Sequence, residues 1–245
     1  MTKSSAVFYT VKAELHCHTN RKLRISYFPF LYDSVQSEEE VLSACLKQHI
    51  HVLAITDHNS LDGYYRARNL IQKKHLPILL IPACEVSSAD GHILAYNINN
   101  LIPQRLSARE TIDRIHHQGG IVFAAHPFNS YPVFGKNISL SDHIYKVPFD
   151  GLEIYNASMS DRSNHLAKLA ADKLGLPGIA GSDAHVPEAI GKAVVLFPEG
   201  TKSISQVIDC LKRGNFRTSG SHSPIFNLAF YHLRDHLRYY LRSSR

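Results

Sequence analysis

Residues 52–58 read VLAITDH, an apolar run that ends directly on an aspartate and a histidine. The same form recurs along the chain: a short apolar segment, a histidine or acidic residue at its end, and then a polar segment with helical spacing. Such alternation predicts strands followed by helices, and therefore a parallel α/β fold. Because the carboxyl ends of parallel strands share one edge, we expect the polar residues that end them to meet there.

Apolar runs and capping residues give the expected elements. The expected strands are Lys12–His16, Val52–Thr56, Ile78–Val86, His92–Asn97, Ile121–Ala125, Gly151–Tyr155, Gly178–Gly181 and Ala193–Phe197. Helices are expected to begin near Ser37, Ser60, Ser107, Asp161 and Ser203. Glycines at the ends of the last two, Gly175 and Gly214, suit C-terminal caps.

The bulk composition is that of an ordinary soluble domain, with 245 residues, 44% hydrophobic and 20% charged. We expect one domain over residues 1–245, and neither a repeat nor a linker is evident. The first residues lack the apolar region of a signal peptide, and the longest apolar run, Leu76–Cys84, is too short to cross a bilayer. The expected location is therefore cytoplasmic, without a membrane partner.

Charge and cysteine content narrow the function classes further. The 4 cysteines show no paired spacing, which argues against a disulfide framework and against a Cys-type zinc site. The net charge of +6 permits an anionic substrate. Part of this charge lies in residues 226–245, expected to form an amphipathic helix with an Arg-rich outer face.

Two pairs of potential metal ligands have a spacing of one intervening residue. His16 and His18 lie at the end of the first expected strand. Side chains at i and i+2 of a strand share a face, so both imidazoles can reach one ion. Asp183 and His185 repeat this spacing after another strand. An isolated histidine is more often an ordinary core or surface residue, so the inference depends on the shared position of the whole set.

The other candidates also adjoin strands. A carboxylate such as Glu85, directly after an apolar run, is costly to bury without a cation or hydrogen-bond donors, and its two oxygens suit it to bridging two metals. Asp57 and Glu153 are expected to support ligands without binding metal. The expected metal ligands are His16, His18, His58, Glu85, His92, His126, Asp183 and His185.

These segments resemble the signature motifs of the PHP superfamily, the polymerase and histidinol phosphatase domains. The matching stretches are ELHCHT (14–19), TDH (56–58), AHP (125–127) and GSDAH (181–185), in the order of the family. Glu85 and His92 match the segment between the second and third motifs. The resemblance implies a distorted (β/α)7 barrel and a cluster of two or three zinc, manganese or iron ions.

The resemblance also implies how the ligands are shared. One metal would lie among His16, His18, Glu85 and Asp183; a second would be held by Glu85, His92 and His126; a third by His58 and His185. The chain departs from the family at Leu23, where many members place an Asp or His that helps to hold the third metal. Asp33 is the candidate to replace that ligand.

The expected reaction is hydrolysis of a phosphate ester. Glu85, Asp183 and His126 would hold, through the metals, the water that attacks phosphorus. Arg21, Lys22, Arg24 and Asn129 are candidates to bind the substrate phosphate, although a solvated loop explains the three cations equally well. The sequence offers no context for a covalent nucleophile.

Several functions fit these residues. The first is a phosphatase acting on a small phosphomonoester or nucleotide. The second is a nuclease acting on DNA or RNA ends, which the Arg-rich tail favours and the absence of an aromatic stacking platform disfavours. The third is a non-enzymatic interaction protein with a degenerate site. An amidohydrolase ranks last, because the strand with a bridging lysine is missing. Oligomeric state and substrate identity do not follow from the sequence.

Overall fold

The computed structural model describes residues 7–19, 34, 36–129, 139–222 and 237. The strands are β1 (Tyr9–Cys17), β2 (Val52–Ile55), β3 (Leu79–Ile81), β4 (Ala83–Ser87), β5 (His92–Tyr96), β6 (Ile121–Ala124), β7 (Gly151–Asn156), β8 (Gly178–Gly181), β9 (Ala193–Pro198) and β10 (Arg217–Gly220). The helices are α1 (Glu38–Lys47), α2 (Asp62–Lys74), α3 (Ala108–His117), α4 (Asp161–Leu174) and α5 (Ile204–Arg213), with 3-10 turns η1 (Ser141–Tyr145) and η2 (Pro187–Ala189). The expected tail helix over 226–245 lies almost wholly outside the described residues.

Local capping chemistry accounts for the helix bounds. Ser37, Ser107 and Ser203 each accept a hydrogen bond from the backbone N–H three residues on, which satisfies one of the free donors of a helix start. Gly175 and Gly214 end α4 and α5 with φ of 65°, a left-handed conformation that costs glycine little. The five helices expected before residue 226 are therefore confirmed, with α2 beginning at Asp62 rather than near Ser60.

The strands form two five-stranded sheets, in the orders β10-β9-β1-β2-β3 and β4-β5-β6-β7-β8. The expected parallel arrangement holds for β1-β2-β3 and β6-β7-β8. It is wrong elsewhere, because β9 runs antiparallel to β1 and β10, and β5 runs antiparallel to β4 and β6. Only a short turn joins β4 to β5, and a parallel pair requires a crossover of a dozen residues or more. Mixed α/β is the observed class.

One expected strand, Ile78–Val86, is two strands. Pro82 separates them, since proline has no backbone N–H to give to a ladder. The first part, β3, pairs with β2, whereas the second part, β4, pairs with β5 in the other sheet. The chain therefore passes from one sheet to the other at Pro82.

The two sheets also touch at two isolated bridges, Cys17 with Ala184 and His58 with Glu85. The backbone bonds His18 N–H to Ala184 O (2.9 Å) and Asn59 N–H to Glu85 O (2.8 Å) reinforce these seams. Both seams lie where strands end and expected metal ligands begin. Complete closure into a seven-stranded barrel stays a prediction.

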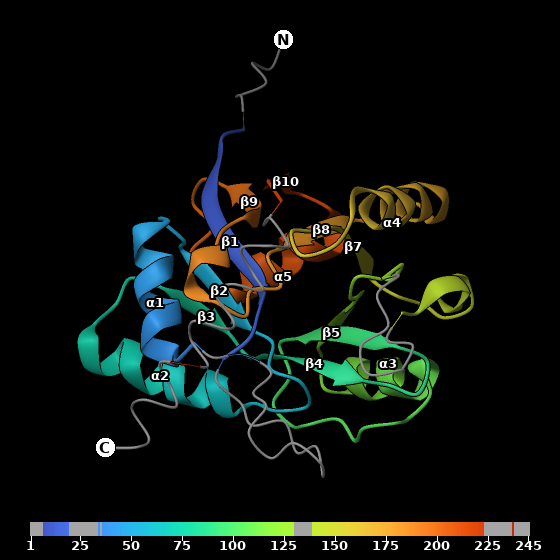
Figure 1. The fold of residues 1–245 in the computed structure, drawn as a ribbon, viewed down its shortest axis with the longest axis horizontal. Coiled ribbons are helices and arrows are strands. Elements are labelled where there is room, and N and C mark those ends of the chain that lie inside the picture. The colour runs from blue at the N-terminus through green and yellow to red at the C-terminus, as the bar shows by residue number, and fades with distance from the viewer. Residues whose placement is uncertain (1–6, 20–33, 35, 130–138, 223–236, 238–245) are drawn as a thin grey trace.

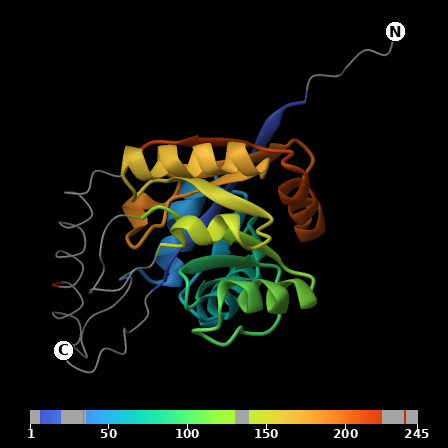
Figure 2. The same ribbon diagram turned by 90° about the vertical axis from the view of Figure 1, so that its right-hand side faces the viewer.

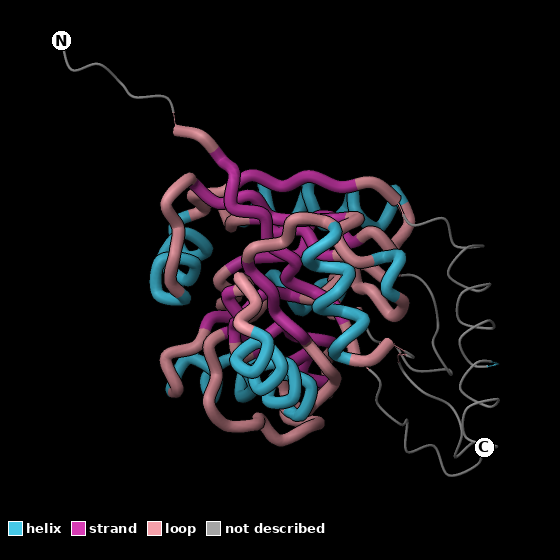
Figure 3. Tube along the Cα trace, turned by 90° about the vertical axis from the view of Figure 1, so that its left-hand side faces the viewer, coloured by secondary structure: helices cyan, strands magenta, loops and turns pink. Residues whose placement is uncertain are grey.

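Helices surround the strands, as Figures 1 and 3 show. α1 and α2 pack on the first sheet, whereas α3, η1 and α4 cover the outer face of the second, which faces the viewer in Figure 2. Between the sheets lies a core with residues from both, and α5 adds Val207 and Leu211 to it. No described helix has the length and apolar content that a membrane span requires.

Tyr96 crosses this core. It is fully buried on β5, and its hydroxyl donates to the carbonyl oxygen of Leu15 on β1 at 2.9 Å. We predict that Tyr96→Phe lowers the free energy of unfolding in urea by about 1–2 kcal/mol, because a buried acceptor loses its donor. Tyr145→Phe, at a ring that is 42% exposed, is the control and should change little. Equal stability of Tyr96→Phe and wild type would contradict this role.

Candidate metal centre

The carboxylate of Glu85 lies at the centre of a cluster of imidazoles, four from the carboxyl ends of β1, β2 and β6 and one, His92, from the start of the antiparallel strand β5. It is 1% exposed and lies in the middle of β4, the strand that follows Pro82. Five imidazole nitrogens lie within 3.4 Å of its oxygens: those of His92 (2.8 Å) and His126 (3.1 Å) at Oε1, and those of His16 (3.3 Å), His18 (3.3 Å) and His58 (3.4 Å) at Oε2. So many nitrogen and oxygen ligand atoms in one buried place are typical of a site for divalent cations.

Asp183 supplies a second carboxylate to the same cluster. Its Oδ1 lies 3.4 Å from Nε2 of His16, 3.2 Å from Nε2 of His18 and 3.8 Å from Nδ1 of His185. The φ of Asp183 is 51°, in the left-handed region that non-glycine residues rarely adopt. His126 also has a positive φ, 25°. Such backbone strain is common where the surrounding structure holds a functional side chain in place.

Glu153 lies behind His16, on the side away from Glu85. Its Oε1 is 2.8 Å from Nδ1 of His16, while its Oε2 accepts the backbone N–H of His126 at 2.8 Å. A carboxylate at Nδ1 favours the tautomer that carries its proton there, which leaves the lone pair of Nε2 directed at the cluster. His185 is held similarly, with Nδ1 at 2.9 Å from the carbonyl oxygen of Asp183.

Burial and the neighbouring charges set the ionisation of the cluster. Burial alone would lower the pKa of His16, but the carboxylates of Glu153, Asp183 and Glu85 outweigh it and raise that pKa well above its ordinary value. The pKa of His126 is raised for similar reasons. Conversely, burial tends to raise the pKa of Glu85 and of Asp183, and the surrounding histidines lower both well below the ordinary values.

The cluster is closed on one side and open on the other. The side chains of His16 and His18 are fully buried. Those of His58, His92 and His185 are 24%, 13% and 22% exposed, so these three form the opening. Solvent therefore contacts the cluster at these last three rings.

Asp57 supports the backbone beside the cluster. Its two oxygens accept from the N–H (2.6 Å) and the hydroxyl (2.5 Å) of Thr19, the residue that follows His18. Gly63 in α2 permits this arrangement, because a Cβ there would lie 2.2 Å from Oδ2 of Asp57. A supporting position is what the sequence predicted for Asp57, although its contact is with Thr19.

The structure brings together the eight residues that were expected from the sequence to be metal ligands. Within the described residues, four groups of side chains have ligand atoms that all lie within 4.8 Å of one another. The groups are His16, His18 and Glu85; His16, His126 and Asp183; His18, Asp183 and His185; and His58, Glu85 and His92. The last group places His58 beside Glu85 and His92, whereas the family resemblance pairs it with His185. Asn129 follows His126 and donates its backbone N–H to the carbonyl of His126 at 3.0 Å. Arg21, Lys22, Arg24 and Asp33 lie outside the described residues.

Three residues around the cluster were given no role by the sequence analysis. Glu14, fully buried, accepts the backbone N–H groups of His16, Ser182 and Gly191, and burial raises its pKa. Thr19 bonds Asp57, and Asn156 bonds the carboxylates of the site. The signal for Asn156 was its place at the end of the strand that carries Glu153.

The donor set fits divalent metal ions. Imidazole and carboxylate are the ligands of zinc, manganese and iron, and the tautomer of His16 is fixed from behind, as in metal-binding histidines generally. Nδ1 of His126 is buried without a hydrogen-bond partner among the described residues, which is unusual for a polar atom. Without cations, the carboxylates rely on protonated imidazoles for charge balance.

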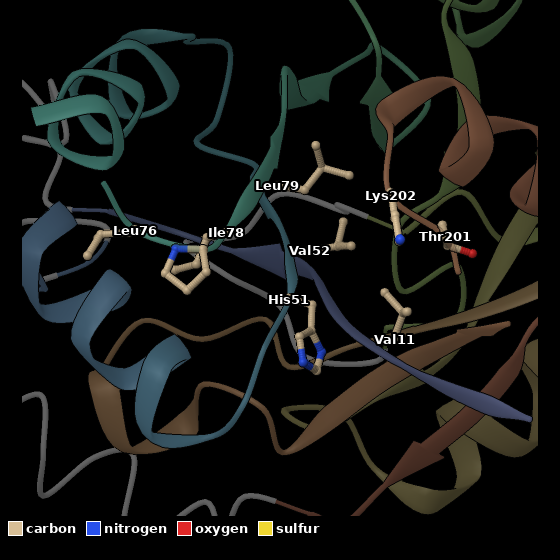
Figure 4. A pocket seen from close by; sticks show the side chains of 9 residues that line it. Val11, His51, Val52, Leu76, Ile78, Leu79, Thr201 and Lys202 are labelled. Carbon is tan, nitrogen blue, oxygen red and sulfur yellow. The ribbon is translucent and has the colours of Figure 1, made fainter. Parts of the chain in front are cut away.

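A separate cavity of about 350 Å³ lies where β2 and β3 begin, and the cluster lies where strands end. Val11, Val52 and Leu79 line it together with His51, Thr201 and Lys202 (Figure 4). It includes none of the clustered ligands, so it is distinct from the candidate metal centre.

Several known proteins are similar to this chain in sequence or in fold. A family model described as PHP-associated matches residues 161–216. Uncharacterized protein MJ1587 of Methanocaldococcus jannaschii is 33% identical over 152 residues, which are 62% of this chain and 85% of that protein. A two-domain protein from Bacteroides vulgatus, described as containing a predicted PHP-like metal-dependent phosphoesterase, superposes with a TM-score of 0.67 at 17% identity, over 87% of this chain and 66% of that one. The chain belongs to the PHP superfamily.

A further similar structure is that of Endonuclease Q in complex with a 27-mer duplex substrate that has an abasic lesion at the active site. It matches with a TM-score of 0.62 and 16% identity, over 86% of this chain and 60% of that one. At such identities the likeness shows the fold alone. This PHP chain also spans less than two thirds of the length of both solved structures.

The pKa shifts predict opposite effects of pH on the metal-free and metal-loaded protein. The raised pKa values of His16 and His126 stabilise the metal-free fold fully below their unfolded value, about 6.5, and this stabilisation is lost as pH rises through the folded values. The lowered pKa values of Glu85 and Asp183 stabilise the fold above the ordinary pKa values of these carboxyl groups. This stabilisation is lost only in acid, as pH falls through the folded values. Metal binding requires deprotonated imidazoles and strengthens as pH rises.

The measurement is the Tm with a chelator and with zinc between about pH 5.5 and 8.5. We predict that the chelated protein melts at lower temperature as pH rises across this range. The stabilisation by zinc should grow over the same range. A zinc shift that does not change with pH, or a metal-free Tm that increases with pH, would contradict the assignment.

Proposed function

We propose that this protein is a metal-dependent phosphoesterase. The observation that carries the proposal is the placement of five imidazole nitrogens within 3.4 Å of one buried carboxylate, Glu85, with Asp183 facing the same space. Membership of the PHP superfamily supports a hydrolase that uses divalent metals. The geometry further supports two or three ions, since four groups of ligands surround the space.

The proposed ligands are His16, His18, His58, Glu85, His92, His126, Asp183 and His185. Bound divalent ions would neutralise the phosphoryl oxygens and acidify a water molecule for attack on phosphorus. Glu85 is proposed to bridge two ions, because each of its oxygens faces a different set of imidazoles. Glu153 is proposed to keep Nδ1 of His16 protonated, so that Nε2 remains a ligand.

The more exposed rings indicate the side from which the ester enters. His58, His92 and His185 border the opening, so the reacting phosphate is proposed to approach past them. Asn129 is proposed to donate a hydrogen bond to the substrate from the loop after His126. Arg21, Lys22 and Arg24 remain candidates for binding the phosphate, and Asp33 for an additional ligand. Closure of the two sheets into a seven-stranded barrel would hold all these groups at one end.

The proposed substrate is a small phosphomonoester or nucleotide. A nuclease is the second candidate, because Endonuclease Q, whose structure holds a duplex substrate, has a similar fold. The test is hydrolysis by the metal-loaded protein of a phosphomonoester panel and of short oligonucleotides phosphorylated at either end. Turnover of small esters alone supports the phosphatase. Oligonucleotide cleavage with steep salt dependence supports the nuclease instead. No turnover and no bound metal would overturn both the phosphatase and the nuclease, and would favour a non-enzymatic interaction protein.

His16→Ala tests the centre itself. Removing this ligand should weaken metal binding by more than about 100-fold, beyond the usual effect of changing a residue that only supports a ligand, and activity should fall with it. Metal content after dialysis and the rate on the best ester are the measurements. His165→Ala, at an exposed histidine on α4, is the matched control and should retain both. Wild-type metal content in His16→Ala would refute the assignment.

A further inference from the structure

Asn156 ends β7 between two carboxylates of the centre and is fully buried. Its Nδ2 donates to Oε2 of Glu153 at 3.0 Å and to Oδ2 of Asp183 at 3.2 Å. One amide group therefore uses both of its hydrogens on two different carboxylates. One of these carboxylates belongs to the proposed ligand set, and the other lies behind His16.

The surroundings leave this amide one orientation. Its Oδ1 accepts the backbone N–H of Ser158 at 2.9 Å, so the nitrogen must face the carboxylates. Asn164 of α4 holds the backbone on either side of the side chain, accepting from Asn156 N–H and donating to Asn156 O, both at 3.0 Å. A side chain with all its polar groups bonded has no freedom to turn away.

The two bonds decide which oxygens are presented to the cluster. With Oδ2 of Asp183 bonded to Asn156, Oδ1 faces His16 and His18. With Oε2 of Glu153 bonded to Asn156 and to the N–H of His126, Oε1 is directed at Nδ1 of His16. The same amide thus orients a ligand carboxylate and the carboxylate that orients a ligand imidazole.

We propose that Asn156 is a positioning residue of the metal centre: its amide fixes the Asp183 and Glu153 carboxylates relative to each other, so that Asp183 and His16 are directed at the same cation. The inference rests on the proposed function, because it requires that the centre bind metal. Asn156 is not itself a proposed ligand, and it acts through Glu153 and Asp183.

A neutral donor suits this position. Two carboxylates close together repel, and a lysine or arginine between them would remove the repulsion by cancelling charge that a divalent cation needs. An amide satisfies one oxygen of each carboxylate without adding charge. The negative charge that attracts the cation is therefore retained.

The test compares two neighbouring asparagines. Asn156→Ala removes the bonds to both carboxylates, whereas Asn164→Ala removes a similar number of bonds at the same strand end and leaves the carboxylates untouched. Chelator-stripped proteins are titrated with Mn²⁺ by calorimetry, and their Tm is measured without metal. We expect Asn156→Ala to bind Mn²⁺ about 10–100-fold more weakly, as for other residues that support ligands. Asn164→Ala should lower the metal-free Tm and keep wild-type affinity.

Two results would overturn the proposal: unchanged Mn²⁺ affinity in Asn156→Ala, or equal weakening in both variants, which would mean that a loosened strand end suffices. If Asn156→Ala does not fold, Asn156→Ser is tested against the same criteria, since its hydroxyl can serve only one carboxylate. A wild-type protein that binds no Mn²⁺ would overturn the proposed function as well. Normal wild-type binding with an unaffected variant would overturn this inference alone.

Discussion

The electrostatic contact between the Glu85 carboxylate and the imidazoles around it is the interaction on which the structure depends. A buried carboxylate without partners costs several kcal/mol, so the rings must stay close to it in the folded protein. The backbone of the same residue joins the sheets, with Glu85 N–H donating to Thr56 O (3.1 Å) and Glu85 O accepting from Asn59 N–H (2.8 Å). The candidate metal centre and the bridge between the two sheets at His58 and Glu85 therefore depend on the same residue.

This coincidence explains why the ligands come from segments so far apart in the chain. The other seam joins the end of β1 to the segment after β8, and it brings His18 beside Asp183 and His185. The apolar core between the sheets and α5 supports the strands from the opposite end. The surrounding seams and core keep His126 and Asp183 in their strained backbone conformations. The side chains of these two residues are therefore held in fixed directions.

Much of the centre could be predicted from the sequence, because a histidine or acid at the end of an apolar run is a local signal. The helix caps at Ser37 and Ser107 were local signals as well. The pairing of strands could not be predicted from local signals. The change of sheet at Pro82 depends on which distant strand pairs with each half of the expected strand. β10 was missed because its residues, RTSG, are exposed and lack apolar alternation. Asn156 was missed because its bond to Asp183 joins two segments that are far apart in the chain.

Anomalous diffraction from crystals grown with zinc or manganese tests the central claim most directly. The account predicts at least two metal peaks, each about 2.0–2.2 Å from a carboxylate oxygen or an imidazole nitrogen of the cluster, with Glu85 contacting both. A single peak elsewhere on the protein, or a Glu85 carboxylate bound only to protonated histidines in the presence of excess metal, would contradict it.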